Sequence, residues 1–450
     1  MLLRRLYWAA YIASHLRGQG GWAFQPPPVI RRAQSRRLRR ILSHAYRHVP
    51  HYQEAMRRLG LTPADFHSAD DLARLPLIER EQVQRDPERF YSRAIPDSQC
   101  LLLPTSGSCG VPIRIRLDLP ALFQSAAHTG RERANVIPIL GRSFGYREAL
   151  IAPDVAQTTL VLDFCHKHAW FPPGRRVQRR IYKIAAPLAH TAAELNNFKP
   201  DLLFSYGSYI DMLLAHARAS GAPFHYPKAI TYSADAMSPA VRRLLLEELR
   251  IPVFAWYRAV EAFNMGQECD HHRGIHLNID LHPLRLVDAE GRPVPAGEQG
   301  DVVVSNLVNR ATVLLNYRLG DRAAMLPDPC SCGRSLPLLS FPPGRGDDFV
   351  VLPSGELAHC ATIHVELVHG EPVWAAQVVQ VSPSHFDVVA VPRERCDPSA
   401  MAARLAHRLS QRLHAEFTVS VTFADSLPRT PGGKCPLFVS KVPRPGQPAR

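Results

Sequence analysis

Residues 101–116 read LLLPTSGSCGVPIRIR, so a turn rich in small and hydroxyl side chains lies between two apolar, β-prone runs. Glycines let backbone N–H groups approach an anion, and hydroxyls donate hydrogen bonds to it, as a polyphosphate requires. The loop is not the GxxxxGK[ST] phosphate loop, because it lacks the lysine of that motif and a proline follows it. An ordinary hairpin turn uses the same residue types, so the loop alone leaves both interpretations open. The candidate phosphate-binding positions are Thr105, Ser106, Gly107, Ser108 and Gly110.

Four polar segments follow at intervals. YRAVE (257–261) comes directly after a predicted strand, at the carboxyl end where open α/β sheets bind ligands. Tyr257 could stack on a base and Glu261 could hold a divalent cation. The segment YRLGD (317–321) ends in a carboxylate, and GRGDD (344–348) has glycines suited to a hinge. The segment LPRTPGGK (427–434) presents one lysine in a loop rich in proline and glycine. Each segment taken alone also fits an ordinary polar turn.

Cysteines and histidines suggest a metal site. Cys330 and Cys332 form one pair, and Cys269 lies upstream in CDHHRGIH (269–276). Three thiols and a choice of imidazoles suffice for tetrahedral Cys₃His zinc. We favour His276 as the fourth ligand, with His271 or His272 as rivals. The alternative is a set of reduced cysteines beside a turn.

Composition limits the function classes. The chain has 450 residues, is 46% hydrophobic and carries a formal charge of +14, which suits nucleic acid, anionic membranes or anionic small molecules as partners. Much of the excess is arginine within 29–40, which is typical of a solvated helix face and lacks the interleaved aromatic residues of a nucleic-acid reader. Nine cysteines without regular spacing favour a reducing cytoplasm.

The first residues, MLLRRLYWAAYIASHL, predict an amphipathic helix rather than a signal peptide or a membrane span. Peripheral membrane contact through its exposed apolar residues is the most that this helix allows.

Alternating strands and helices predict an α/β fold: a large domain with parallel and mixed sheets and a β-rich part, plus a small mobile α+β domain. The boundaries are 1–343, including a helical extension over 1–30, and 344–450 for the smaller domain. Strands are expected at 149–152, 159–164, 201–205, 228–232 and 252–256. Helices are expected at 121–134, 179–192, 210–219, 238–249 and 399–417.

Taken in order, the five motifs resemble those of the adenylate-forming superfamily of acyl-CoA synthetases. The lead-in LRRILSHAYRHVPHYQEAMRRLGL, the segment DDLARLPLI and the cysteine pairs narrow the resemblance to the phenylacetate-CoA ligase and CapK-like capsule-biosynthesis branch. It covers roughly residues 37–441. The family reaction it implies is attack of a carboxylate on the α-phosphate of ATP, followed by displacement of AMP by a thiol of CoA or a carrier protein.

The resemblance also assigns roles. Thr105, Ser106, Gly107, Ser108 and Gly110 hold phosphates, Tyr257 stacks near adenine and Glu261 binds Mg²⁺. Asp321 and Arg345 hold ribose, Asp347 is the hinge, and Lys434 bridges carboxylate and phosphate. The acid pocket is expected within 128–233, with Phe164, His168, Tyr206 and Ser233 as candidates, and Ser233 also adjoins the nucleotide. The resemblance further implies a structural zinc, a small-molecule carboxylic acid as substrate and a possible homodimer.

Four departures qualify the resemblance. Arg258 replaces a usual glycine, Val260 a threonine, Leu319 a threonine or serine, and Cys109 a threonine. Arg258 could block the ligand pocket or pair with an acidic substrate. We hypothesise the second, because a buried unpaired guanidinium is costly. The alternatives are a repurposed or degenerate member that binds ligand without CoA ligation, or one that transfers the acyl group to an amine.

Overall fold

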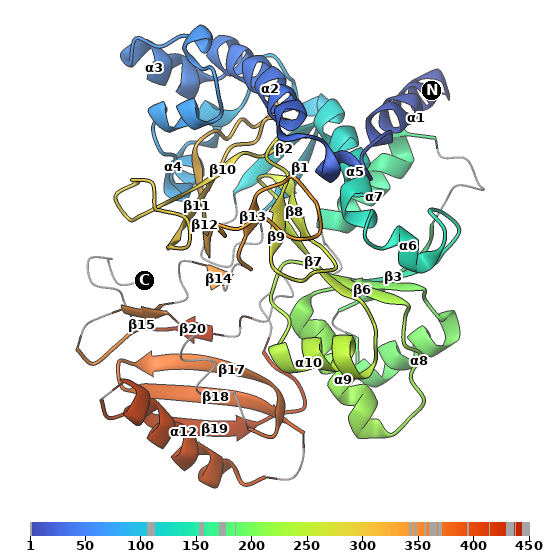
Figure 1. Cartoon of the computed structure of the whole chain (residues 1–450), viewed down its shortest axis with the longest axis vertical. Coiled ribbons are helices and arrows are strands. Elements are labelled where there is room, and N and C mark those ends of the chain that lie inside the picture. The colour runs from blue at the N-terminus through green and yellow to red at the C-terminus, as the bar shows by residue number, and fades with distance from the viewer. Residues whose placement is uncertain are drawn as a thin grey trace. The chain divides into compact units, whose positions relative to one another are not determined.

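The computed structural model describes residues 2–105, 113–152, 157–170, 177–184, 186–341, 344–345, 349–354, 357–359, 367, 371–393, 396–413, 415–428, 436 and 438–442. The chain forms two compact units, each assembled from three chain segments (Figure 1). Unit 1 comprises Met1–Tyr146, Asp154–Gln178 and Phe254–Pro342, and unit 2 comprises Arg147–Pro153, Arg179–Val253 and Pro343–Arg450.

Unit 1 carries the N-terminal helices and most of the predicted site motifs. Its α-helices are α1 (Leu2–Leu16), α2 (Pro27–His48), α3 (Pro50–Arg58), α4 (Arg80–Arg85), α5 (Leu119–Arg133), α6 (Ile137–Leu140) and α7 (Gln157–His168). Short 3₁₀ turns join them: η1 (Trp22–Phe24), η2 (Pro63–Asp65), η3 (Asp70–Arg74), η4 (Pro87–Phe90) and η5 (Asp97–Gln99). The α2 core face buries Ile30, Leu38, Ile41 and Leu42 at helical spacing.

The strands of unit 1 are antiparallel. β1 (Cys100–Pro104) and β2 (Arg114–Asp118) form a hairpin around the predicted phosphate loop. β7 (Val253–Ala259), β8 (Phe263–Glu268), β9 (Ile275–Leu277) and β13 (Leu338–Leu339) pair in that order. β10 (Leu284–Val287), β11 (Gln299–Val304) and β12 (Tyr317–Ala324) form a third group.

Unit 2 contains a parallel core and a βαβ unit. β3 (Arg147–Ala152), β5 (Leu202–Ser205) and β6 (Ala229–Tyr232) are parallel, and β4 (Gln178–Lys183) lies beside β3. The helices of this part are α8 (Leu188–Phe198), α9 (Gly207–Ser220), α10 (Pro239–Arg243) and the π-helical turn η7 (Leu244–Glu248). The Ser238 hydroxyl accepts a hydrogen bond from the Val241 N–H, which makes it the N-cap of α10.

Further along, the C-terminal part of unit 2 has its own core. The sheet order is β19-β18-β17-β20, with α12 connecting the parallel pair β18 and β19. The elements are β14 (Gly344–Arg345), β15 (Phe349–Val351), β16 (Leu357–His359), β17 (Val373–Ser382), β18 (His385–Pro392), α12 (Pro398–Leu413), β19 (Thr418–Phe423) and β20 (Phe438–Ser440). Leu405 and Leu409 of α12 pack on Val378, Phe386 and Val388 of the sheet.

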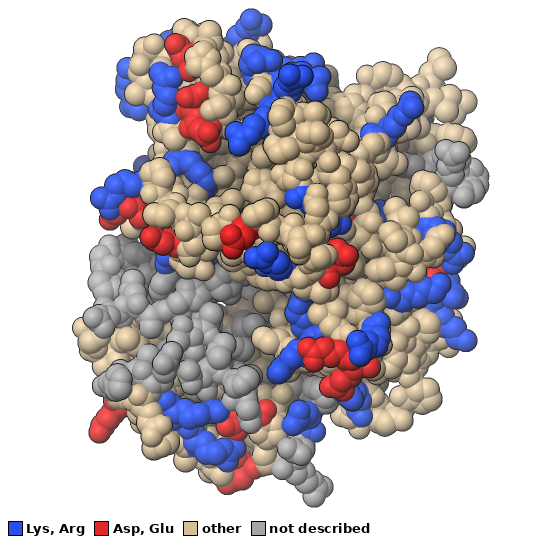
Figure 2. Space-filling model, in the orientation of Figure 1, with Lys and Arg blue, Asp and Glu red and all other residues tan. Residues whose placement is uncertain are grey.

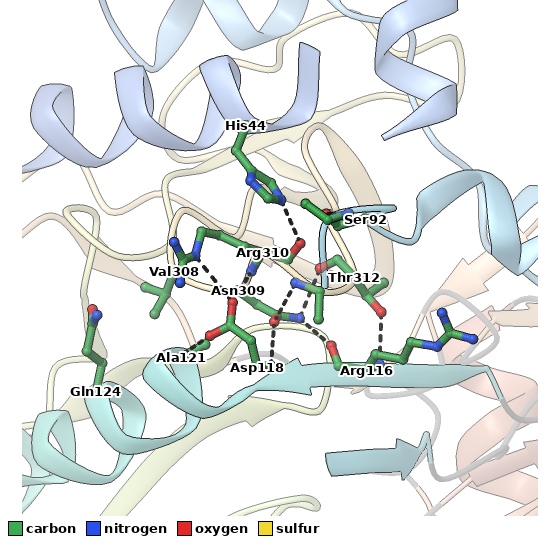
Figure 3. A network of polar contacts seen from close by, with 12 residues as sticks. His44, Ser92, Arg116, Asp118, Ala121, Gln124, Val308, Asn309, Arg310 and Thr312 are labelled. Atoms are coloured by element: carbon green, nitrogen blue, oxygen red, sulfur yellow. Dashed lines mark hydrogen bonds and ion pairs between the residues drawn. The ribbon is translucent and has the colours of Figure 1, made fainter. Parts of the chain in front are cut away.

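A polar network fixes the β1–β2 hairpin in unit 1 (Figure 3). Asp118, at the end of β2, accepts the Ala121 N–H at 2.7 Å and so caps α5, while its other oxygen lies 3.3 Å from Arg310 Nε. Asn309 Nδ2 donates to the Arg116 carbonyl, and the Arg116 N–H donates to Thr312 Oγ1. These contacts hold the strand that leaves the predicted phosphate loop.

The α/β fold class, with parallel and mixed sheets and a β-rich part, is confirmed. Two local expectations are wrong. Residues 159–164 lie in helix α7, because a short apolar run does not distinguish a strand from a helix. Residues 179–192 form β4 and the start of α8, and Arg179 bonds Glu148 on the neighbouring strand β3. The domain boundary at Gly344 stays a prediction.

Within the described residues, no helix combines the length and the apolar character needed to cross a bilayer.

Candidate active site

Thr105 closes the hairpin around the predicted phosphate loop. Its N–H donates to the Ile113 carbonyl at 2.8 Å, and its hydroxyl accepts the Ile113 N–H at 3.0 Å. Thr105 is buried. The two ends of the loop are therefore held together by Thr105 itself, leaving its side chain in one defined position.

Arg80 joins two predicted site residues that lie far apart in the sequence. Its Nη2 donates to Thr105 Oγ1 at 2.9 Å, and its Nη1 lies 3.6 Å from Glu261 Oε1. The Arg80 side chain is 16% exposed and that of Glu261 is 7% exposed, so this ion pair is shielded from water. A cation thus lies between the start of the phosphate loop and the carboxylate predicted to bind Mg²⁺.

Backbone pairing places Arg80 there. The Ile78 N–H donates to the Asn316 carbonyl and the Arg318 N–H donates to the Ile78 carbonyl, both at 2.9 Å. Glu79 then caps α4 reciprocally with Gln82, so Arg80 is the first residue of the helix. The guanidinium is carried on a segment pinned to the start of β12.

Glu261 is held through its main chain. Asn306 Nδ2 donates to the Glu261 carbonyl at 2.8 Å, and Glu261 follows β7 in a tight turn before β8. This anchorage leaves the carboxylate to interact with Arg80.

Tyr257 and Asp321 are also brought together, with the tyrosine hydroxyl 2.8 Å from Asp321 Oδ2. Both lie inside strands rather than after them, since β7 runs to Ala259 and β12 begins at Tyr317. A register shift against β11 places a bulge between Arg318 and Arg322, and Gly320 within it has φ +90°, which favours glycine. The bulge positions the Asp321 carboxylate.

The structure corrects the hypothesis about Arg258. Its Nε donates to Glu132 Oε1 at 2.9 Å, its Nη2 bonds the other oxygen, and its guanidinium carbon lies 4.5 Å from the Trp256 ring centroid. Glu132, on α5, is fully buried. The guanidinium has an internal carboxylate partner, so the argument that it needs an acidic substrate is wrong.

The sulfur and imidazole atoms of Cys269, His276, Cys330 and Cys332 all lie within 4.8 Å of one another. The Cys269 and Cys330 sulfurs are 3.7 Å apart, and Cys332 Sγ is 3.3 Å from His276 Nε2. A tetrahedral zinc with bonds of about 2.3 Å to sulfur separates two thiolates by about 3.8 Å, so the set fits the ion. Of the rivals, His271 instead bonds Ser331 and His272 bonds Glu268.

Burial favours the neutral forms of Cys269 and His276 in the absence of a cation. It raises the pKa of the Cys269 thiol to about 12, and it lowers the pKa of His276 to about 4. A bound cation would offset the first effect by deprotonating the thiol, whereas a neutral imidazole is already the form that binds metal.

Fewer contacts define the positions of the other predicted site residues. Ser233, at the end of β6 in unit 2, donates its N–H to the Ser205 carbonyl at 3.2 Å and precedes Ala234 with φ +77°. Arg345 lies in β14. Phe164 and His168 share α7, with ring centroids 4.2 Å apart, and Tyr206 precedes α9. Outside the described residues lie Ser106, Gly107, Ser108, Cys109, Gly110, Asp347 and Lys434.

Sequence reasoning missed Arg80 and Glu132. Each acts through a partner more than 120 residues away, namely Glu261 and Arg258. A charged residue in an ordinary helix start gives no local signal of such a contact. Glu132 carried a weak signal, because a carboxylate in a buried helix requires a partner.

No family model matches the chain. The phenylacetate-coenzyme A ligase of Thermus thermophilus is 22% identical over 448 residues, covering 91% of this chain and 96% of that protein. The Escherichia coli phenylacetate-coenzyme A ligase is 23% identical over 437 residues, with 90% and 93% covered. At 22–23% identity over about nine-tenths of its length, the chain is similar to these phenylacetate-coenzyme A ligases.

Solved structures of CoA ligases share the fold. A 2-hydroxyisobutyryl-CoA ligase in the postadenylation state superposes with a TM-score of 0.74 at 18% identity, covering 92% of this chain and 90% of that one. An anthranilate CoA ligase in complex with anthranoyl-AMP gives 0.55 at 15% identity, covering 81% and 73%.

Proposed function

We propose that this protein is a member of the adenylate-forming superfamily that activates a carboxylic acid with ATP and Mg²⁺ and then transfers the acyl group to a thiol. A carboxylate oxygen attacks the α-phosphorus, the bond to pyrophosphate breaks, and the acyl-adenylate forms. The thiol then attacks the acyl carbon, and AMP leaves. The observation that carries the proposal is Arg80, whose guanidinium contacts both Thr105 of the phosphate loop and the Glu261 carboxylate.

Charge explains why this arrangement suits adenylation. A carboxylate and a triphosphate are both anions, so the site needs cations that reduce their repulsion. Glu261 would hold Mg²⁺, which neutralises phosphate charge when bound. Arg80 would then turn from Glu261 toward the phosphates, because a carboxylate and a phosphate both accept charge-assisted hydrogen bonds from a guanidinium.

The remaining roles follow the superfamily pattern. Tyr257 would stack near adenine, Asp321 and Arg345 would hold the ribose, and Ser233 would adjoin the nucleotide. The loop residues Ser106, Gly107, Ser108 and Gly110 would hold phosphates with Thr105. Residues 344–450 would form a lid that turns about Asp347 and delivers Lys434 to the carboxylate and phosphate.

The acid is a monocarboxylate in this proposal. Arg258 and Glu132 neutralise each other, so Arg258 offers no spare charge to a second carboxylate. Its bulk, where the superfamily usually has glycine, would narrow the space beside Tyr257.

A structural zinc at Cys269, His276, Cys330 and Cys332 completes the proposal. These residues would bind the ion through three thiolates and one imidazole and would link the β9 region to the 330–332 turn. All four protein ligand positions are filled, which leaves none open for substrate.

The acceptor is CoA, as in the relatives' names, with a carrier-protein thiol or an amine as alternatives that the same adenylate would serve. Thiol ligands fit a reducing cytoplasm. A homodimeric assembly and membership of the CapK-like subgroup are further proposals, which rest on the sequence resemblance. A degenerate, non-catalytic member is the second candidate, favoured by Leu319, which is buried and lacks the usual hydroxyl.

Pyrophosphate exchange over a panel of carboxylic acids tests the proposal. We expect labelled pyrophosphate to enter ATP only with Mg²⁺ and a suitable monoacid. Calorimetry with ATP separates the second candidate, because a degenerate site binds ATP poorly. If there is neither exchange nor ATP binding, the enzymatic proposal is wrong.

A further inference from the structure

The first 53 residues differ in charge from the rest of the chain. They contain ten arginines and no lysine, aspartate or glutamate, and so carry ten of the fourteen net positive charges. The first carboxylate is Glu54. A segment of this length without an acidic residue creates a positive surface that its own side chains do not neutralise.

Eight of these arginines are exposed. They are Arg4, Arg17, Arg31, Arg32, Arg36, Arg39, Arg40 and Arg47. The other two have protein partners: Arg5 bonds the carbonyls of His166 and Ala169, and Arg37 pairs with Asp280. None of the eight forms an ion pair with a residue that the structure describes. Figure 2 shows the basic side chains gathered over α2, where Arg32, Arg36 and Arg39 recur at helical spacing.

Exposed apolar side chains accompany the arginines. On the first two turns of α1, Leu2 is 62% exposed, Leu3 83% and Tyr7 59%. The opposite side of α1 makes the packing contacts, with Trp8 stacked on Phe123 at 4.7 Å between ring centroids. The exposed leucines therefore do not hold the helix in place. Phe24 and Val29 are likewise exposed where η1 leads into α2.

We propose that residues 2–53 dock unit 1 on an anionic phospholipid surface. The α2 arginines contact lipid phosphates, and the α1 leucines with Tyr7 enter the headgroup region. Charge complementarity argues for the bilayer, and the exposed leucines favour it over a nucleic acid, which offers no apolar interior to receive them. The inference is independent of the proposed ligase activity.

Sedimentation of the full chain with vesicles tests this inference. We compare phosphatidylcholine vesicles with vesicles containing one-third phosphatidylglycerol, at 0.1 M salt. We expect binding to the anionic vesicles alone, and binding that weakens steeply with added salt. The triple variant Arg32→Gln/Arg36→Gln/Arg39→Gln should bind on the order of a hundredfold more weakly, because each arginine near the surface contributes about fivefold to the binding constant.

A charge-matched control and a variant of the apolar residues complete the design. Arg243→Gln/Arg250→Gln/Arg393→Gln removes the same charge from exposed arginines of unit 2 and should bind as the wild type does. Leu2→Ser/Leu3→Ser should lower binding about tenfold or more without changing the charge. The proposal is overturned if the wild type does not bind anionic vesicles, if both arginine variants bind equally, or if an RNA duplex binds while vesicles do not.

Discussion

Two side-chain clusters of unit 1 are built on opposite principles. Arg80, Thr105 and Glu261 form a cluster of charged and hydroxyl groups whose partners are exchangeable, because a phosphate or Mg²⁺ can replace either contact. Cys269, His276, Cys330 and Cys332 form a closed set with matched distances and no spare ligand position. Under the proposed function, the first cluster serves the chemistry and the second serves stability.

This contrast predicts different losses from substitutions in each region. Substitutions in the cluster of Arg80, Thr105 and Glu261 should lower activity and keep stability. Substitutions among Cys269, His276, Cys330 and Cys332 should lower stability and metal content together.

The largest expected effect is on Lys434. Lys434→Ala should slow pyrophosphate exchange about a thousandfold, roughly 4 kcal/mol of transition-state stabilisation, because the lid cation is lost during adenylation. Lys441→Ala is the matched control and should retain exchange within about threefold. An equal loss in both variants would contradict the role of Lys434.

Cys330→Ser should abolish bound zinc and lower the free energy of unfolding by about 4 kcal/mol, because the set loses a thiolate ligand. Metal analysis and thermal denaturation measure the two effects. Cys165→Ser, a buried cysteine outside the set, is the control and should keep its metal. If Cys330→Ser leaves the fold intact but abolishes exchange, the division between the clusters breaks down.

Glu132→Gln should destabilise unit 1 by about 3 kcal/mol, because it leaves the Arg258 guanidinium without its carboxylate. The double variant Glu132→Gln/Arg258→Met should recover much of that loss, since it removes both charges. Urea denaturation of the four proteins in the cycle gives the coupling. Additive single effects would mean that the two side chains do not depend on each other.

The smallest effect is expected at Arg80. Arg80→Gln should lower kcat/KM for ATP about thirtyfold, about 2 kcal/mol, by removing one charge-assisted contact to phosphate. Arg80→Lys should recover part of this, and Arg85→Gln on the same helix should change little. A Tm drop without a kinetic effect would make Arg80 a structural residue.

The sequence predicts much of this fold because the decisive signals are local. The strands on either side of residues 105–113 and the helices expected at 121–134 and 399–417 need only neighbouring residues. Helix α7 and strand β4 escaped prediction, because the Arg179 contact with Glu148 and the packing around Cys165 decide them.

The same distinction applies to the site. Ordered motifs predict site roles for Thr105, Tyr257, Glu261 and Asp321. In the structure Arg80 contacts both Thr105 and Glu261, and Tyr257 bonds Asp321 directly. Arg80 itself depends on backbone pairing between Ile78 and Arg318, which no local pattern encodes. The partner of Arg258 was also invisible, so its charge was assigned to the substrate.

Transfer of oxygen from the acid to AMP tests the central claim most directly. The wild-type protein is incubated with ATP, Mg²⁺, CoA and a monoacid labelled with ¹⁸O in its carboxylate, and the products are analysed by mass spectrometry. Attack of the carboxylate on the α-phosphorus predicts one ¹⁸O in AMP and none in pyrophosphate. Label in inorganic phosphate with formation of ADP, or AMP without label, would contradict adenylation by this site.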